Sequence, residues 1–319
     1  MNKKAGPSVH ARPRVTVKKR VGFLNLAGEI RNQIYEYYFQ QGFKCEFAEK
    51  DAKLGHKRRD CLKFFSGKLR SDDVYPICER NFTPVTTVRF SRVLGRYKRI
   101  QGLDTGWKTS LTGLIFVCKQ VYTECICFFY LNTTFAFDSP NRIVNFLKVP
   151  SVTNLANVTK IQLHYHTYSD PKRSEDIRWK GKHLESWSRT CKTAARKLVN
   201  LQHIDIWVHT RETNVRLGID EPYLKPISWF RKRRDPSKTI AKALRTANVH
   251  IVTIWNRRGA FTDMRLQLAS QHLHNLFEEA ISCMILGATP EVAMEDFNYA
   301  WENQYTQWHH HLQFASTGW

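Results

Sequence analysis

The chain has 319 residues, 42% of them hydrophobic, and carries 50 lysines and arginines against 28 aspartates and glutamates, a formal net charge of +22. This length and apolar content allow a sizeable core and exclude an intrinsically disordered chain. The eight cysteines are not spaced like the framework of a small secreted disulfide protein, so we expect an intracellular protein, in the nucleus, the cytoplasm or both.

The positive charge is concentrated in two regions. Residues 1–20, a predicted disordered tail, contain seven lysines and arginines and no acid, and no apolar segment of a secretory signal follows them. Residues 41–110 add an excess of eight positive charges. Such regions favour polyanions or act as nuclear-import signals. The candidate residues for either role are Lys18, Lys19, Arg20, Arg231, Lys232, Arg233 and Arg234.

A short amphipathic helix is predicted at 26–38, because apolar residues recur there at helical spacing. These residues are Leu26, Ile30, Ile34, Tyr37 and Tyr38. Glu29 falls in the first turn, where an acidic side chain suits the helix dipole. The pattern alone leaves two interpretations open: the helix only covers a core, or it offers an apolar face to a partner.

Residues 41–110 are interpreted as a basic insertion with short strands near 85–90. A second helix is predicted over 111–129, where apolar residues form one continuous stripe. A strand follows at 134–137, and the Ser139–Pro140 pair predicts the start of a further short helix.

From this point the sequence repeats. Three similar segments begin at Asn157, Asn200 and Asn248, which are 43 and then 48 residues apart. Each predicts a strand, at 159–166, 202–209 and 249–255, and helices are predicted at 183–199, 238–247 and 264–286. Strands separated by helices pair in parallel. The predicted fold is therefore α/β, with a small open or curved parallel sheet backed by helices, and a last helix at 290–319.

Short motifs for catalysis, nucleotides or metals are not convincing in this sequence. The stretch 102–110 lacks the glycine spacing and the adjacent Gly-Lys pair of a phosphate loop. Cys45, His56, Cys61 and Cys78 lack the closely spaced pairs of structural zinc sites. We therefore predict no catalytic residue, metal or cofactor, and no membrane segment.

Histidines occupy matching places in two of the repeated strands. His164 and His166 lie two residues apart and so share one face of a strand, and His209 has the equivalent place in the next repeat. A polar, solvent-facing side of a half-exposed sheet is the favoured interpretation, and a functional histidine-lined edge is the alternative.

Two stretches resemble a known family. "FLNLAGEIRNQIYEYYF" (23–39) resembles the F-box-like domains common in fungal proteins, which have the pattern L-P-x-E-I-R-x-x-I-Y. "LIFVCKQVYTECICFFYLNTTFAFD" (114–138) resembles the companion pattern C-R-Q-I-Y-x-E followed by Y-x-x-N-T-F-x-F. The matching residues are Leu26, Glu29, Ile30, Arg31, Ile34 and Tyr35, then Cys118, Gln120, Tyr122, Glu124, Tyr130, Asn132, Thr133 and Phe135.

The resemblance implies a non-enzymatic interaction protein. In F-box proteins the first helices dock on the Skp-type adaptor of a cullin ubiquitin ligase, and the repeats behind them hold a substrate protein. Carried over to this chain, Leu26, Glu29, Ile30 and Ile34 lie at or beside the adaptor-docking surface. Ala27 stands where the family pattern has proline.

The expected organisation has four parts: a tail (1–20), an F-box-like helical region with the insertion (21–132), a β-α repeat domain (133–289) and a C-terminal helix (290–319). The alternative function is that of a nuclear nucleic-acid-associated protein that binds through its basic tail and insertion.

Overall fold

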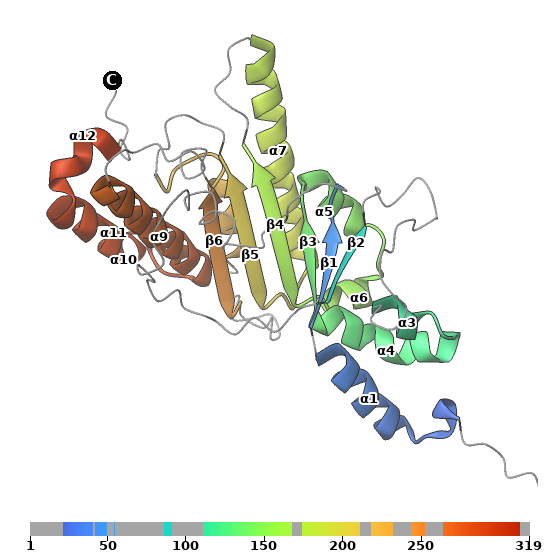
Figure 1. Ribbon diagram of the computed structural model, residues 1–319. Helices are drawn as coiled ribbons and strands as arrows, with labels where there is room; N and C mark the ends of the chain where they lie inside the picture. The colour runs from blue at the N-terminus through green and yellow to red at the C-terminus, as the bar shows by residue number, and fades with distance from the viewer. Residues whose placement is uncertain are drawn as a thin grey trace, which may run out of the picture.

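The computed structural model describes residues 22–40, 42–49, 54, 86–90, 111–167, 174–210, 218–231, 244–252 and 264–312. In this part of the chain six strands form one open sheet in the order β2-β1-β3-β4-β5-β6 (Figure 1). They are β1 (Phe43–Phe47), β2 (Thr86–Phe90), β3 (Thr133–Phe137), β4 (Lys160–His166), β5 (His203–His209) and β6 (Thr246–Val252). All neighbours are parallel, so the predicted α/β class with an open parallel sheet backed by helices is confirmed.

Helices lie on one face of the sheet and at its two ends (Figure 1). The longer ones are α1 (Gly28–Gln40), α4 (Lys119–Asn132), α7 (Ser174–Lys197) and α9 (Met264–Leu286). The short ones are α3 (Leu111–Ile115), α5 (Pro140–Phe146), α6 (Val152–Ala156), α10 (Pro290–Ala293), α11 (Glu295–Tyr299) and α12 (His309–Leu312). Two 3-10 segments, η1 (Phe23–Asn25) and η2 (Lys225–Phe230), precede α1 and β6.

Helix α7 packs on the apolar face of the sheet. Every second residue of β5 is buried, as expected for a strand with one covered face. The Trp187 side chain of α7 stacks on Tyr165 of β4 with ring centroids 4.8 Å apart, and its indole N–H donates to the backbone oxygen of Tyr223 at 3.0 Å. Trp187 therefore joins the helix, the sheet and the segment before η2 in one core.

Helix α9 protects the open edge of the sheet at β6. The backbone N–H of Val249 donates to the Ser282 hydroxyl at 3.1 Å, and that of Ile251 donates to the Glu278 carboxylate at 2.8 Å. These side chains satisfy backbone groups that would otherwise be available for pairing with another strand.

Several predicted boundaries need correction. The helix expected over 111–129 is two helices, because Cys118 has an extended backbone (φ −162°) that separates α3 from α4. Ala247, assigned to a helix at 238–247, lies in β6, and most of that predicted helix falls outside the described residues. The predicted C-terminal helix is divided into α10, α11, α12 and short 3-10 and π-helical turns at 300–308.

The sheet does not begin at residue 133, where we placed the repeat domain. Strand β1 pairs with both β2 and β3, so the region 41–110 supplies two strands, one of them inside the sheet. The strand expected near 85–90 is present as β2, whereas β1 was not predicted. What we interpreted as an insertion is therefore in part a structural component of the same sheet.

Candidate functional site

Helix α1 has two apolar faces, only one of which is buried in the chain. Tyr35 and Phe39 are fully buried and pack on α4, with ring centroids 6.2 Å from Phe128 and 6.3 Å from Phe129 respectively. We call the unit formed by residues 22–40 and 111–132 the helical lobe. It projects from the amino-terminal end of the strands (Figure 1).

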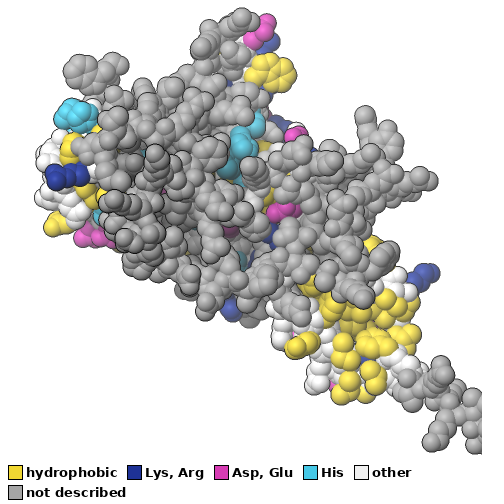
Figure 2. All heavy atoms as spheres, in the orientation of Figure 1, with side chains coloured by type: hydrophobic (Ala, Val, Ile, Leu, Met, Phe, Trp, Pro, Cys, Tyr) yellow, Lys and Arg dark blue, Asp and Glu magenta, His cyan; other side chains and the backbone are white. Residues whose placement is uncertain are grey.

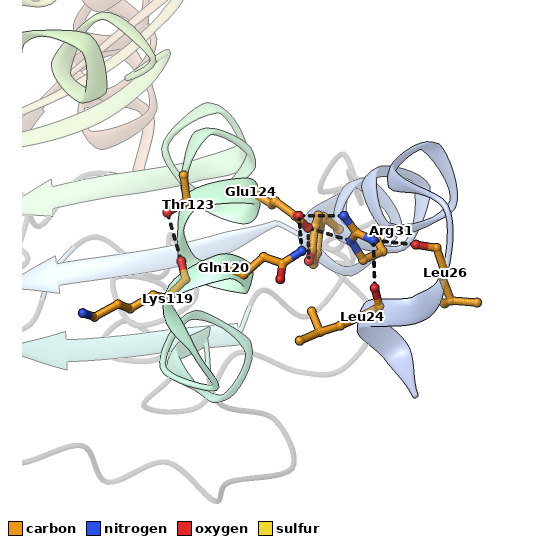
Figure 3. Close-up of polar contacts among 8 residues, drawn as sticks. Leu24, Leu26, Arg31, Lys119, Gln120, Thr123 and Glu124 are labelled. Carbon is orange, nitrogen blue, oxygen red and sulfur yellow. Dashed lines mark hydrogen bonds and ion pairs between the residues drawn. The ribbon is translucent and has the colours of Figure 1, made fainter. Parts of the chain in front are cut away.

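A network of polar side chains, all matched to the F-box-like patterns, joins α1 to α4 (Figure 3). The guanidinium of Arg31 donates to both carboxylate oxygens of Glu124, from Nε at 2.8 Å and from Nη2 at 2.7 Å. The Tyr35 hydroxyl and the Gln120 amide donate to the same carboxylate at 2.9 and 3.0 Å. One carboxylate thus accepts four hydrogen bonds, two of them in the paired geometry that only arginine provides.

The Arg31–Glu124 network also fixes charge. The hydrogen bonds from Arg31 and then Gln120 lower the pKa of Glu124 to about 2, so its carboxylate is ionised at neutral pH. Burial, together with the hydrogen bond to Glu124, raises the pKa of Tyr35 to about 12, so its hydroxyl remains a donor. The network is therefore complete in one protonation state over the whole neutral range.

Replacement of Glu124 by glutamine is expected to loosen α1 from α4. The amide keeps the shape of the carboxylate, but it removes the charge and one of the two acceptors that Arg31 uses. Amide hydrogen exchange in α1 should become faster by about tenfold or more, while exchange in β4 and β5 stays unchanged. Glu185→Gln, at an exposed i,i+4 pair with Arg189, is the matched control. Equal protection of α1 in the Glu124→Gln variant would contradict this role.

The second apolar face of α1 is exposed. Ile30, Ile34 and Tyr37 recur at helical spacing, turned away from Tyr35 and Phe39, and their exposed fractions are 45%, 39% and 72%. Figure 2 shows hydrophobic side chains gathered over the helical lobe. Large apolar side chains that form a contiguous exposed surface are typical of protein-interaction sites.

The break between α3 and α4 adds to this surface. Phe116 and Val117 lie in the turn there and are 62% and 65% exposed, and Tyr122 of α4 is 43% exposed. The helical lobe contains little charge, namely Arg31 and Lys119 against Glu29, Glu36 and Glu124. In a chain of +22 this surface is therefore nearly neutral, and the basic excess lies elsewhere.

The predicted docking residues fall into two environments. Ile30, Ile34 and Glu29 are exposed on α1, and Leu26 is half-buried just before it. The interpretation of α1 as a mere core cover therefore does not hold for Ile30 and Ile34. The signal that we did not recognise in the sequence was the second stripe, Tyr35 and Phe39, which does the packing.

The predicted basic residues are only partly described. Lys18, Lys19, Arg20 and residues 232–234 lie outside the described part of the chain. Arg231 is exposed, and its Nη2 donates to the backbone oxygen of Gly287 at 2.9 Å, at the end of α9. This contact joins the end of η2 to the end of α9 within the chain.

The interpretation of the histidines as a solvent-facing row is wrong for His164, which is only 2% exposed. Its Nε2 lies 2.7 Å from the Gln162 amide nitrogen and its Nδ1 lies 3.1 Å from Nε2 of His209, whereas His166 is exposed. Cys45, one of the rejected metal ligands, is buried in β1, and burial raises the pKa of its thiol. His56, Cys61 and Cys78 lie outside the described residues.

The carboxyl ends of β1 and β3 form the switch point of the sheet, where open parallel sheets commonly bind ligands. Asp138 follows β3 there. Its Oδ2 accepts from the backbone N–H of Glu49 at 2.7 Å, and its Oδ1 lies 2.8 Å from Nε of Arg142. Both carboxylate oxygens therefore have partners within the chain.

Within the described ranges, no group of three or more histidine, cysteine, aspartate or glutamate side chains is placed to hold a metal ion. None of the helices described is both long and apolar enough to cross a membrane.

Comparison with known proteins identifies one family. A model described as a domain of unknown function (DUF7730) matches residues 18–216, a range that includes the helical lobe and β1 to β5 and ends before β6. No curated protein and no solved structure matches the chain. Because the matched range covers more than half of the 319 residues, the chain belongs to the family of this domain of unknown function, DUF7730.

Proposed function

We propose that this protein is a non-enzymatic interaction module, a substrate-recruiting F-box-like subunit that docks a Skp-type adaptor on the exposed face of its helical lobe. The observation that carries the proposal is the stripe of Ile30, Ile34 and Tyr37, which is exposed although the same helix buries Tyr35 and Phe39 on its other side. The mechanism is positional: the lobe holds the ligase, and the β-α part of the chain holds a substrate protein in the nucleus or cytoplasm.

The residues that match the F-box-like patterns have two roles, and this supports the proposal: some join α1 to α4, and others are exposed on α1. Arg31, Tyr35, Gln120 and Glu124 point toward one another and fix the angle between α1 and α4 (Figure 3). Ile30 and Ile34 alternate with them along α1 and remain exposed. A rigid support for an exposed apolar stripe is suited to docking, because less conformational entropy is lost on binding.

The start of α1 is held in a second way. Ala27 stands where the F-box-like pattern has proline, which removes a residue that favours the first turn. Nη1 of Arg31 donates to the backbone oxygens of Leu24 and Leu26, which keeps the entering segment against the helix (Figure 3). Arg31 therefore provides some of the rigidity that the missing proline would supply.

The near-neutral charge of the helical lobe favours an apolar partner over a polyanion. A nucleic acid would be attracted by the basic residues elsewhere, and its binding would fall steeply with salt. Docking through Ile30 and Ile34 buries apolar side chains and depends little on ionic strength. Salt therefore separates the proposal from the nucleic-acid alternative.

Calorimetric titration of the purified full chain with a Skp-type adaptor tests the proposal. We expect micromolar or tighter binding that changes little between about 50 mM and 200 mM salt. The Ile30→Asp, Ile34→Asp variant should bind about a hundredfold more weakly or not at all, because two charges would have to be buried in the interface.

A second double variant controls for general effects of added charge. Val152 and Ile177 are 84% and 61% exposed outside the lobe, so Val152→Asp, Ile177→Asp introduces the same two charges. This variant should bind the adaptor like the unmodified chain, and far-ultraviolet circular dichroism should show both variants folded. Absence of adaptor binding, or equal loss in both variants, would refute the docking proposal. Salt-sensitive binding to nucleic acid instead would favour the alternative.

A further inference from the structure

The end of the molecule opposite the helical lobe has the reverse charge of the rest of the chain. Residues 264–312, from α9 to α12, contain one arginine, Arg265, and six acids: Glu278, Glu279, Glu291, Glu295, Asp296 and Glu302. The unit is therefore −5 in a chain of +22. It also lies beyond residue 216, where the family match ends.

Exposed apolar side chains lie among these acids. Val292 of α10 and Tyr299 of α11 are 65% and 61% exposed, and Glu295 and Asp296, which lie between them in the sequence, are also exposed. Phe297 and Ala300, from the same segment, are buried in the core. Figure 2 shows acidic and hydrophobic side chains together at this end of the molecule. We call Val292, Glu295, Asp296, Tyr299 and Glu302 the C-terminal exposed face.

The acids of this face are not used to hold the fold together. Glu278, which is not part of this face, does have a structural role, because its carboxylate caps the edge of β6. Hydrogen bonding to its own backbone N–H and to Thr289 lowers the pKa of Glu291. In the part of the chain that the structure describes, the carboxylates of Glu295, Asp296 and Glu302 form no hydrogen bond or ion pair. Within the described ranges, three carboxylates thus have no partner, and two exposed apolar side chains lie in the same segment, so the surface offers both charge and apolar contact to a binding partner.

We propose that the C-terminal exposed face binds a lysine- and arginine-rich segment of a partner protein that also carries apolar side chains. Charge complementarity selects this occupant. A basic segment is repelled by the net charge of the chain, so it can bind only where the local potential is negative. Val292 and Tyr299 supply the apolar contact that an acidic surface alone would lack.

This inference deepens the proposed function by naming the chemical class of its substrate, but the surface itself does not depend on an adaptor. The helical lobe and the C-terminal exposed face lie at opposite ends of the sheet (Figure 1). The two surfaces therefore do not overlap, and one partner does not cover the site of the other.

The test uses the full chain and a fluorescein-labelled amphipathic peptide made of lysine and leucine, followed by fluorescence anisotropy without any adaptor. We expect binding that weakens with salt and at least about tenfold weaker binding to Glu295→Lys, Asp296→Lys, since two attractions become repulsions. Val292→Ser, Tyr299→Ser should also weaken binding. A peptide with glutamate in place of lysine should not bind to this face of the unmodified chain, and it should bind better to Glu295→Lys, Asp296→Lys, where the face has become basic.

A matched variant separates a local site from overall charge. Glu175 and Glu185 are exposed on α7, so Glu175→Lys, Glu185→Lys changes the net charge by the same amount at another place. This variant should bind the lysine–leucine peptide like the unmodified chain. No binding by the unmodified chain, or equal loss in the two lysine variants, would overturn the inference. Because the adaptor is absent from this test, either result leaves the adaptor-docking result to stand or fall separately.

Discussion

Replacement of Trp187 by alanine is expected to lower the free energy of unfolding by about 3–5 kcal/mol, the range found for removing a large aromatic side chain from a core. Trp187 is 1% exposed, stacks on Tyr165 and donates a hydrogen bond to the backbone of Tyr223. The variant loses all three contributions at one position. Urea unfolding followed by circular dichroism measures the effect, which is a large fraction of the total stability of a typical domain.

Trp179, on the same helix, is the matched control. It is 56% exposed, and within the described residues its ring contact is with the ammonium of Lys182, 4.9 Å from the ring centroid. Trp179→Ala should therefore cost about 1 kcal/mol or less. Equal destabilisation by the two substitutions would mean that α7 is not anchored to the sheet through Trp187.

Acidification is expected to destabilise the protein from about pH 6.5 downward, before most carboxylates are protonated. Burial, with nearby His209 and Lys44, lowers the pKa of His164 to about 2 from an ordinary value of 6.5. Below pH 6.5 the unfolded chain binds a proton at this histidine and the folded chain does not. Its contribution is thus complete above pH 6.5 and is lost progressively as the pH falls toward 2, by roughly 2 kcal/mol at pH 5.

His250 should act in the opposite direction. Burial lowers its pKa, but hydrogen bonds and the charges of Asp205 and Glu278 outweigh burial and raise the pKa to about 9. Its contribution is therefore complete below pH 6.5 and is lost as the pH rises through 9. The midpoint of urea unfolding, measured across this range, should be highest near neutral pH.

Two variants test which residue causes the loss of stability at acid pH (the acid limb) and which causes the loss at alkaline pH (the alkaline limb). His164→Gln should flatten the acid limb and leave the alkaline limb unchanged, and His250→Gln should do the reverse. An acid limb as steep in His164→Gln as in the unmodified chain would show that other groups control stability there.

The strands that were predicted correctly have a strong local signal. In β5, apolar and polar residues alternate, and the related segments around β4 and β6 repeat the pattern at a nearly constant interval. Strand β1 was missed because Lys44 and Glu46 make its sequence look like a surface segment. Both side chains are nevertheless buried, at 5% and 2% exposure, and form an ion pair at 3.4 Å. The two partners are close in the sequence, but the local pattern does not show that the fold buries them.

In the helical lobe, too, the sequence predicts the helix but not which of its faces is buried. Periodicity placed α1 correctly within two residues at each end, but it did not reveal which of two apolar stripes faces the core. That choice depends on the contact of Arg31 with Glu124, which are 93 residues apart in the sequence. The break after Ile115 was also hidden, since the apolar stripe continues across it.

The acidic composition of residues 264–312 can be counted from the sequence, but the C-terminal exposed face cannot be read from it. The net charge of +22 masks an acidic unit of −5 at residues 264–312. Which acids remain without partners could not be read from the sequence, since Glu278 and Glu295 differ only in what the fold places beside them.

The position of β1 inside the sheet has a consequence for folding during synthesis. Residues 43–47 leave the ribosome early, but their neighbour β3 follows 90 residues later, several seconds at ordinary translation rates of about 5–20 residues per second. The 90 residues between β1 and β3 add little to the free-energy cost of bringing the two strands together, because the entropy cost of closing a loop grows only slowly with its length. In the meantime Tyr35 and Phe39 lack their neighbours in α4, Phe128 and Phe129, whereas β4, β5 and β6 each pair with the preceding strand. The amino-terminal part of this protein is therefore made first but waits longest for its neighbouring strand, and it is the part with the greatest need of a chaperone.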